Sequence, residues 1–286
     1  MKNISIKSLL VVLKTYISNL PKSIKVLLLI NIVAYFIFII TYVCFLYNLK
    51  CIFGAYPTCS EKFKVFKIFT YMFSHDIIPD HIISNLILFL LFAPAVSRVI
   101  GDNNTIKLYI FSGLISFLSF NYIMNNKHNE IVDKLTETGF DVRKIKQDNH
   151  GYIEMSTFDN TNKKQERLLN EYPHTNGRLY GASGSIFAFM IIYPFLFIKR
   201  KKSILLNLIV LYFVIDTILM VINIVIYHDI YYLGTPFSHL GGFIGGIFFF
   251  IFWMLYLNNK TVGYLFTENK KAIQNEAAPI LKINAS

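Results

Sequence analysis

Charged side chains are scarce in this chain of 286 residues. Lys, Arg, Asp and Glu together make up only 16% of it, whereas soluble domains carry about 25%. Hydrophobic residues account for 54%, and there are 27 phenylalanines. The shortage of charge excludes an ordinary soluble domain and is typical of a membrane protein.

Acidic residues are scarcer than basic ones, and none precedes Glu61. The net charge of +11 would suit a nucleic-acid partner if the basic residues formed a separate stripe. Instead, they cluster in short runs beside apolar segments, as the positive-inside rule produces. We therefore expect no nucleic-acid partner. The lysine-bearing stretch 1–24 is interpreted as a cytosolic lead-in; a transit peptide is the alternative, although the stretch has no arginine.

Cysteine is also rare, and its placement excludes a metal site. Cys44 lies in a hydrophobic run, and Cys51 and Cys59 follow that run. No spacing typical of metal ligands is present. A disulfide between Cys51 and Cys59 and a pair of free thiols both remain open.

What the chain has in abundance is long apolar runs, each of about 17–25 residues. Because backbone groups in hydrocarbon must bond to one another, these runs are expected to be helices. The sequence therefore predicts an all-α, polytopic membrane protein with one six-helix bundle over residues 25–257. The expected spans are 25–47, 81–97, 106–124, 181–198, 204–227 and 237–257.

The connecting segments predict the orientation. Residues 199–202 carry four basic side chains and no acid, so this short loop should be cytosolic. Both termini, including the tail 258–286, are then cytosolic. The aromatic first loop, 48–80, is expected to be interfacial. The polar stretch 125–178 is expected to be an inserted, partly disordered loop outside the cytosol.

Four polar residues stand out inside the spans: His81, Asn85, Ser183 and His239. Polar groups in a span are costly and suggest function. With this topology, all four lie at similar depth near the outer ends of three spans. Ser183 would be the nucleophile and His239 its base. His81 and Asn85, four residues apart on one helix face, would stabilise an oxyanion together with the Ser183 N–H.

Glycines flank both proposed catalytic residues and would let the fourth and sixth spans approach closely. We expect this role for Gly181, Gly184, Gly242 and Gly246. Each feature has a plainer interpretation when it is taken alone. A serine between glycines is usually a packing residue, and a histidine at a helix end is usually interfacial. The matching depth of all four polar residues favours the functional interpretation.

Three motifs on alternate spans resemble those of rhomboid intramembrane proteases. GASG at 181–184 is similar to the family's GxSG motif, SHLGGFIGG at 238–246 to its AHxxGxxxG motif, and HIISN at 81–85 to its HxxxN motif. The resemblance implies a serine endopeptidase that cleaves single-pass membrane substrates with a Ser–His dyad. It implies no metal or organic cofactor, and substrate entry from the bilayer beside the fifth span.

The sequence departs from the family pattern at several places, and one additional residue precedes His81. These departures put the supporting scaffold in question rather than the dyad. Phe66-Lys67 replaces a Trp-Arg pair, Ala93 and Pro94 replace glycines, Ser97 replaces a Glu, Phe187 replaces a Tyr, and Ser238 replaces an Ala.

Two other functions are considered. The first is a catalytically silent rhomboid-like factor that binds membrane proteins and controls their traffic, and the second is a transporter. The lack of internal repeats argues against a transporter. Asp216, in the middle of the fifth span, is interpreted as a structural, hydrogen-bonded carboxyl or as part of a polar gate. The loop histidines, His75 included, are given no role. A secretory or plasma membrane is favoured over the mitochondrial inner membrane, and the Asn-, Lys- and Ile-rich composition suggests an AT-rich genome, such as that of a protozoan.

Overall fold

A computed structural model describes residues 11, 14–45, 49–146, 153–158, 161–197, 204–227 and 234–257. The described residues are mostly helical and form no strand; their one extended pairing is an isolated antiparallel bridge between Ala55 and Leu179. The chain divides into a large unit, Met1–Ile247, and a small one, Phe248–Ser286. The predicted all-α polytopic class is confirmed.

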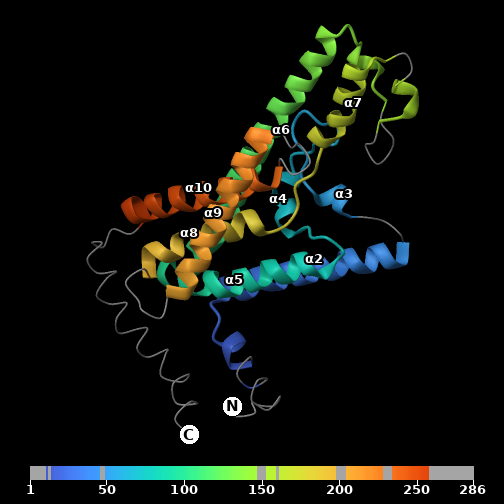
Figure 1. Ribbon diagram of the computed structural model, residues 1–286. Coiled ribbons are helices and arrows are strands. Elements are labelled where there is room, and N and C mark those ends of the chain that lie inside the picture. The colour runs from blue at the N-terminus through green and yellow to red at the C-terminus, as the bar shows by residue number, and fades with distance from the viewer. Residues whose placement is uncertain are drawn as a thin grey trace, which may run out of the picture. The chain divides into compact units, whose positions relative to one another are not determined.

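Six apolar helices correspond to the six predicted spans (Figure 1). They are α2 (Lys22–Phe45), α5 (Pro79–Ile100), α6 (Asp102–Glu137), α8 (Ser183–Phe197), α9 (Ile204–Tyr227) and α10 (Gly234–Phe252). Five of them are long and apolar enough to cross a membrane. The sixth, α8, has 15 residues, and it begins two residues later than predicted because the chain is not yet helical at Gly181.

Helix α8 lies at the centre of the bundle. It is apolar on all sides, which is typical of a fully buried helix. Its principal neighbours are α5 and α6. Phe89 of α5 meets Phe189 edge to face at 5.8 Å, and Phe92 meets Tyr193 at 5.3 Å. The short helix is therefore held mainly by its neighbours, and its first residue, Ser183, is held with it.

Hydroxyl and carboxylate groups join α2, α5 and α6 at the end of the bundle opposite the predicted catalytic residues. Asp102, in the first turn of α6, accepts hydrogen bonds from the N–H (2.9 Å) and Oγ (2.6 Å) of Ser23 in α2. The Ser23 hydroxyl also lies 3.1 Å from the Ser97 hydroxyl of α5. Ser97 stands where the family pattern has a Glu, so in this chain the acid of the cluster comes from α6.

Part of the first loop is buried against the helices of the bundle. It contains α3 (Lys50–Phe53), α4 (Lys67–Thr70) and the 3₁₀ turn η1 (Tyr71–Phe73). Tyr71 and Met72 are almost fully buried. The Tyr71 hydroxyl donates to the Gly113 carbonyl of α6 at 2.6 Å. This loop is therefore packed against α6, although Phe66 beside it stays exposed.

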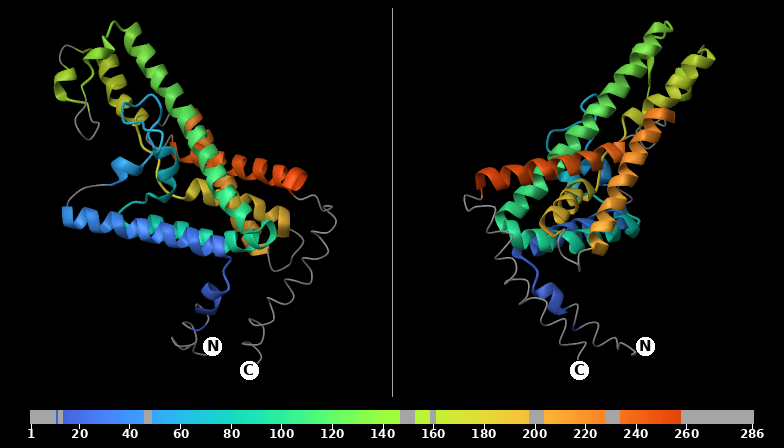
Figure 2. Two further views of the ribbon diagram at one scale, coloured as in Figure 1. Left: turned by 180° about the vertical axis from the view of Figure 1, so that it is seen from behind. Right: turned by 60° about the vertical axis from the view of Figure 1, so that its left-hand side comes forward.

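Much of the stretch expected to be a polar loop is helical. Helix α6 continues to Glu137, two 3₁₀ turns follow (Val142–Lys144 and Met155–Phe158), and α7 spans Lys163–Thr175. Figure 2 shows α7 alongside the distal half of α6. A small hydrophobic core joins them, and it contains Ile131, Leu135, Leu168 and Leu169. The polar composition of this stretch as a whole did not indicate the two helices, because about four apolar positions suffice to pair two amphipathic helices.

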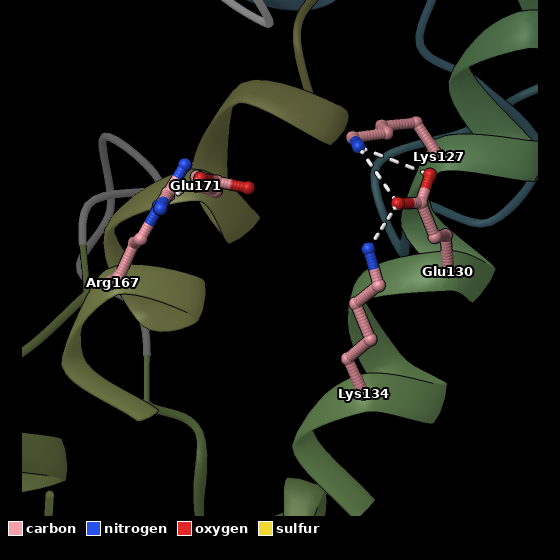
Figure 3. Close-up of polar contacts among 5 residues, drawn as sticks. All are labelled: Lys127, Glu130, Lys134, Arg167 and Glu171. Carbon is pink, nitrogen blue, oxygen red and sulfur yellow. Dashed lines mark hydrogen bonds and ion pairs between the residues drawn. The ribbon is translucent and has the colours of Figure 1, made fainter. Parts of the chain in front are cut away.

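Both helices of this pair carry ion pairs (Figure 3). Glu130 accepts from Lys127 at 3.0 Å and from Lys134 at 2.5 Å, and Arg167 contacts Glu171 at 3.2 Å. Such exposed pairs add little stability, but a surface that carries them is suited to contact with water. With 36 residues, α6 is about 54 Å long, well beyond a hydrocarbon core of about 30 Å. We expect its distal half to stand outside the bilayer.

Candidate active site

Ser183 is the first residue of α8, and the strap 176–182 that leads into it is fixed by backbone hydrogen bonds. Ala55 and Leu179 exchange two of them, at 2.9 and 2.7 Å, and the Gly181 N–H donates to the Tyr71 carbonyl at 3.0 Å. Gly181 has a φ of +105°, a conformation that side chains with a Cβ rarely adopt. The hydrogen bonds between the strap and the first loop therefore fix the position at which α8 begins with Ser183.

His239 lies in the second turn of α10 and points at Ser183. Its Nε2 is 3.1 Å from Ser183 Oγ, a hydrogen-bond distance. Phe187, one turn after the serine, stacks on the imidazole with the ring centroids 4.1 Å apart and the planes 17° from parallel. No carboxylate of the described residues is hydrogen-bonded to this ring, so the Phe187 stack orients it.

Small residues bring α8 and α10 close enough for this contact. A Cβ built on Gly242 would lie 2.9 Å from the carbonyl carbon of Gly184, and one on Gly246 would lie 2.7 Å from the Ala188 Cα. Both helices thus present small residues four positions apart, the pattern that permits close helix packing in membranes. The predicted glycines Gly184, Gly242 and Gly246 all lie in this contact.

Helix α10 also contacts α6, which the sequence analysis did not connect to the site. Ser238, directly before His239, is buried, and its hydroxyl is 2.7 Å from that of Ser116 in α6. A Cβ on Gly241 would lie 2.8 Å from the Ile115 carbonyl oxygen. Ser116 gave no sequence signal, because a serine in a span is common and its partner lies 122 residues away.

His81 and Asn85 lie on α5 facing the strap before Ser183. A Cβ on Gly181 would be 2.8 Å from His81 Nε2 and 3.9 Å from Asn85 Nδ2. Asn85 Nδ2 also donates to the His81 carbonyl at 2.8 Å, and it carries a second N–H for another acceptor. The structure thus brings two side-chain nitrogens to the strap that ends at Ser183. Pro79, two residues before His81, is the first residue of α5, a position that proline favours.

A second histidine, which the sequence analysis left without a role, lies behind His81. The His75 ring is fully buried and 5.5 Å from the His81 ring, and neither of its nitrogens has a hydrogen-bond partner among the described residues. On its other side, His81 meets Tyr180 edge to face at 5.6 Å, and the Tyr180 hydroxyl is 3.3 Å from Asp76 Oδ2. His81 is therefore held between two rings.

The burial of His75 predicts a loss of stability in acid. Burial, with a smaller effect from His81, lowers the pKa of His75 from 6.5 to about 4. Between these values the unfolded chain binds more protons than the folded one, so stability is full above pH 6.5 and falls as the pH drops. The slope is at most about 1.4 kcal/mol per pH unit. Thermal unfolding in detergent at pH 7 and pH 5 should show a smaller acid loss for His75→Leu than for the unmodified protein; equal losses would contradict the prediction.

Cys59 carries a free thiol in the structure, and the side chain of Cys51 lies outside those that are described. Burial raises the pKa of the Cys59 thiol to about 11, which lowers the fraction of reactive thiolate at neutral pH.

Comparison with known proteins adds one finding. A family model described as a Rhomboid domain matches residues 62–140 and 151–256. The match begins in the first loop and includes α5, α6, α8, α9 and nearly all of the described part that follows. No curated protein and no solved structure matches the chain.

Proposed function

The chain belongs to the rhomboid family, and from that premise we propose that it is an intramembrane serine endopeptidase with a Ser183–His239 dyad. The observation that carries the proposal is the 3.1 Å contact between Ser183 Oγ and His239 Nε2. It joins the first turn of α8 to the second turn of α10, in an integral, multi-pass membrane protein. The substrates are transmembrane-anchored proteins.

The geometry supports a two-step acyl transfer. Ser183 Oγ attacks the scissile carbonyl carbon while His239 Nε2 accepts the hydroxyl proton. The tetrahedral intermediate collapses as the C–N bond breaks, and His239 gives the proton to the leaving amine. Water then attacks the acyl ester while His239 takes its proton, and His239 returns that proton to Ser183 Oγ as the ester C–O bond breaks and the acid product leaves. Since no acid among the described residues is hydrogen-bonded to it, the imidazole depends on the Phe187 stack for its alignment.

The oxyanion needs donors where the charge develops. The Ser183 N–H is one of the unpaired amides that begin every helix. His81 and Asn85 complete the site from α5, because both approach Gly181 in the strap. Each donor contributes about 10²- to 10³-fold in kcat in comparable serine hydrolases. Tyr180 and His75 on either side of His81 restrict its ring.

Substrate entry beside α9 fits the packing of that helix. Its main contact is with α8, and most of its apolar side chains are exposed. A helix held on one side can move away from the bundle with little loss of contact. We place the enzyme in a secretory or plasma membrane, with its active site near the outer face.

The alternative is a catalytically silent homologue that binds membrane proteins. A fluorophosphonate probe, which reacts with activated serines, separates the two. We expect covalent labelling of the detergent-solubilised protein at Ser183, located by peptide mass spectrometry, and no labelling of Ser183→Ala. The matched control is Ser185→Ala, two residues away, where the buried hydroxyl instead donates to the Tyr109 carbonyl at 2.7 Å; it should label normally. A folded protein that does not react would favour the silent homologue.

A further inference from the structure

Three polar side chains lie on one face of α9. Asp216 is the thirteenth of its 24 residues, at its midpoint. At 100° per residue, Tyr212 and Asn223 fall within about 40° of Asp216 around the helix axis. We call Tyr212, Asp216 and Asn223 the polar stripe of α9. It extends over eleven residue steps, or about 16 Å of helix.

The stripe is separate from the face by which α9 packs. Val210, Thr217 and Ile224, spaced seven apart, are buried and form a seam about 100° around the helix from Asp216. Tyr212, in contrast, is 64% exposed, Asn223 is exposed and Asp216 is partly exposed. Within the described part of the chain, no hydrogen bond or ion pair is found for Asp216 or Asn223. A hydrogen-bonded structural role for Asp216, one of the two interpretations given above, therefore finds no support among the described residues.

A membrane span with this surface needs a partner. Lipid tails offer no hydrogen-bonding group, and a carboxyl at mid-bilayer is costly unless it is paired. The exposed hydroxyl, carboxyl and amide groups of the stripe lie in one line along α9. A second helix lying alongside α9 therefore contacts all three. Because Asp216 accepts hydrogen bonds or balances a positive charge, the matching partner has a donor near the middle of its span.

We propose that the polar stripe of α9 docks the transmembrane helix of a substrate that carries a hydrogen-bond donor, such as Asn, Gln or Lys, near the bilayer midplane. This inference rests on the proposed function, and it names the feature by which that site selects substrates. The stripe lies on α9, the least buried of the five described helices long enough to span a membrane and the one beside which a substrate is expected to enter.

The stripe is also connected to the dyad through aromatic rings. Tyr212 meets Phe213 at 5.5 Å, and Phe213 meets Phe187 of α8 edge to face at 5.7 Å. Phe187 is the ring that stacks on His239. Tyr212 of the stripe is therefore two aromatic contacts from Phe187, the residue that orients the base.

The test compares two single-pass substrates that differ only at mid-span, with Asn in one and Leu in the other. Binding is measured in the Ser183→Ala background, by photo-crosslinking from a probe at position 219, beside the stripe. Binding therefore does not depend on catalysis, and a failure of the proposed protease activity remains distinguishable. We expect a three- to tenfold preference for the Asn substrate, the range given by an interhelical hydrogen bond in a membrane.

Asp216→Leu should reduce this preference to about one, and Asp216→Asn should retain part of it because the amide keeps an acceptor oxygen. The matched control is Leu211→Ala, an exposed position of α9 away from the stripe, which should keep the full preference. The proposal is overturned if Asp216→Leu keeps the preference. It is equally overturned if the probe at position 219 captures a second copy of this chain instead of the substrate.

Discussion

Replacing His239 with alanine is expected to abolish cleavage of a membrane-anchored substrate while the protein still folds. The imidazole is the only base within hydrogen-bond distance of Ser183 Oγ in the described structure. Without it, the serine keeps its proton and is a poor nucleophile. In serine proteases, removing a single residue of the catalytic unit reduces kcat by factors of about 10⁴ to 10⁶. The measurement is the cleavage rate of a tagged single-pass substrate in reconstituted vesicles.

The stack on His239 offers a graded control for this result. Phe187→Leu keeps an apolar side chain but removes the ring that lies 4.1 Å from the imidazole, so the base remains and loses its alignment. We expect cleavage to fall by about 10- to 100-fold, since small misalignments of reacting groups have effects of this size. Ser183→Ala combined with His239→Ala should be no slower than either single variant. Cleavage by His239→Ala within tenfold of the unmodified protein would exclude this histidine as the base.

The helical frame and the motif residues could be predicted because each depends on local pattern. Apolar runs predicted α9 over its described range, Ile204–Tyr227, and most ends of the other spans to within a few residues. The exception is α6, which continues to Glu137, well past its predicted end at residue 124. Ser183 and His239 were found because a polar group in hydrocarbon is conspicuous, and the orientation rule placed both at one depth. The roles of these residues and the limits of the domains stay predictions.

Other features could not be predicted because they depend on contacts between distant segments. The buried pair Ser116–Ser238 joins positions whose residue types are ordinary in spans. The partner helices α6 and α7 are separated by about 25 residues, and a core of four buried apolar residues with five partly buried ones packed against it joins them. The hydrogen bond from the Tyr71 hydroxyl to the Gly113 carbonyl of α6 likewise joins residues 42 positions apart. Composition does not specify such partners.

Replacing Gly242 with valine is expected to separate α10 from α8 and to destroy both stability and activity. A Cβ at this position would meet the backbone of Gly184, which cannot rotate away as a flexible side chain would. Overpacking a well-packed core costs about 1–3 kcal/mol, and sometimes more; rigid backbone on both sides favours the upper part of that range. Unfolding of the purified protein in detergent, followed by circular dichroism in increasing denaturant, measures this loss.

The matched control places a larger side chain at an exposed position of the same helix. Ile244 is partly exposed on α10, so Ile244→Phe should change the unfolding free energy by less than about 0.5 kcal/mol. Activity provides the second measurement. Because Gly242 lies three residues from His239 and faces the helix that begins with Ser183, any widening of this contact lengthens the 3.1 Å distance between the dyad atoms. A displacement of about 1 Å is enough to lower the rate about 100-fold. A Gly242→Val variant as stable and active as Ile244→Phe would mean that the close approach of α8 and α10 does not hold the dyad together.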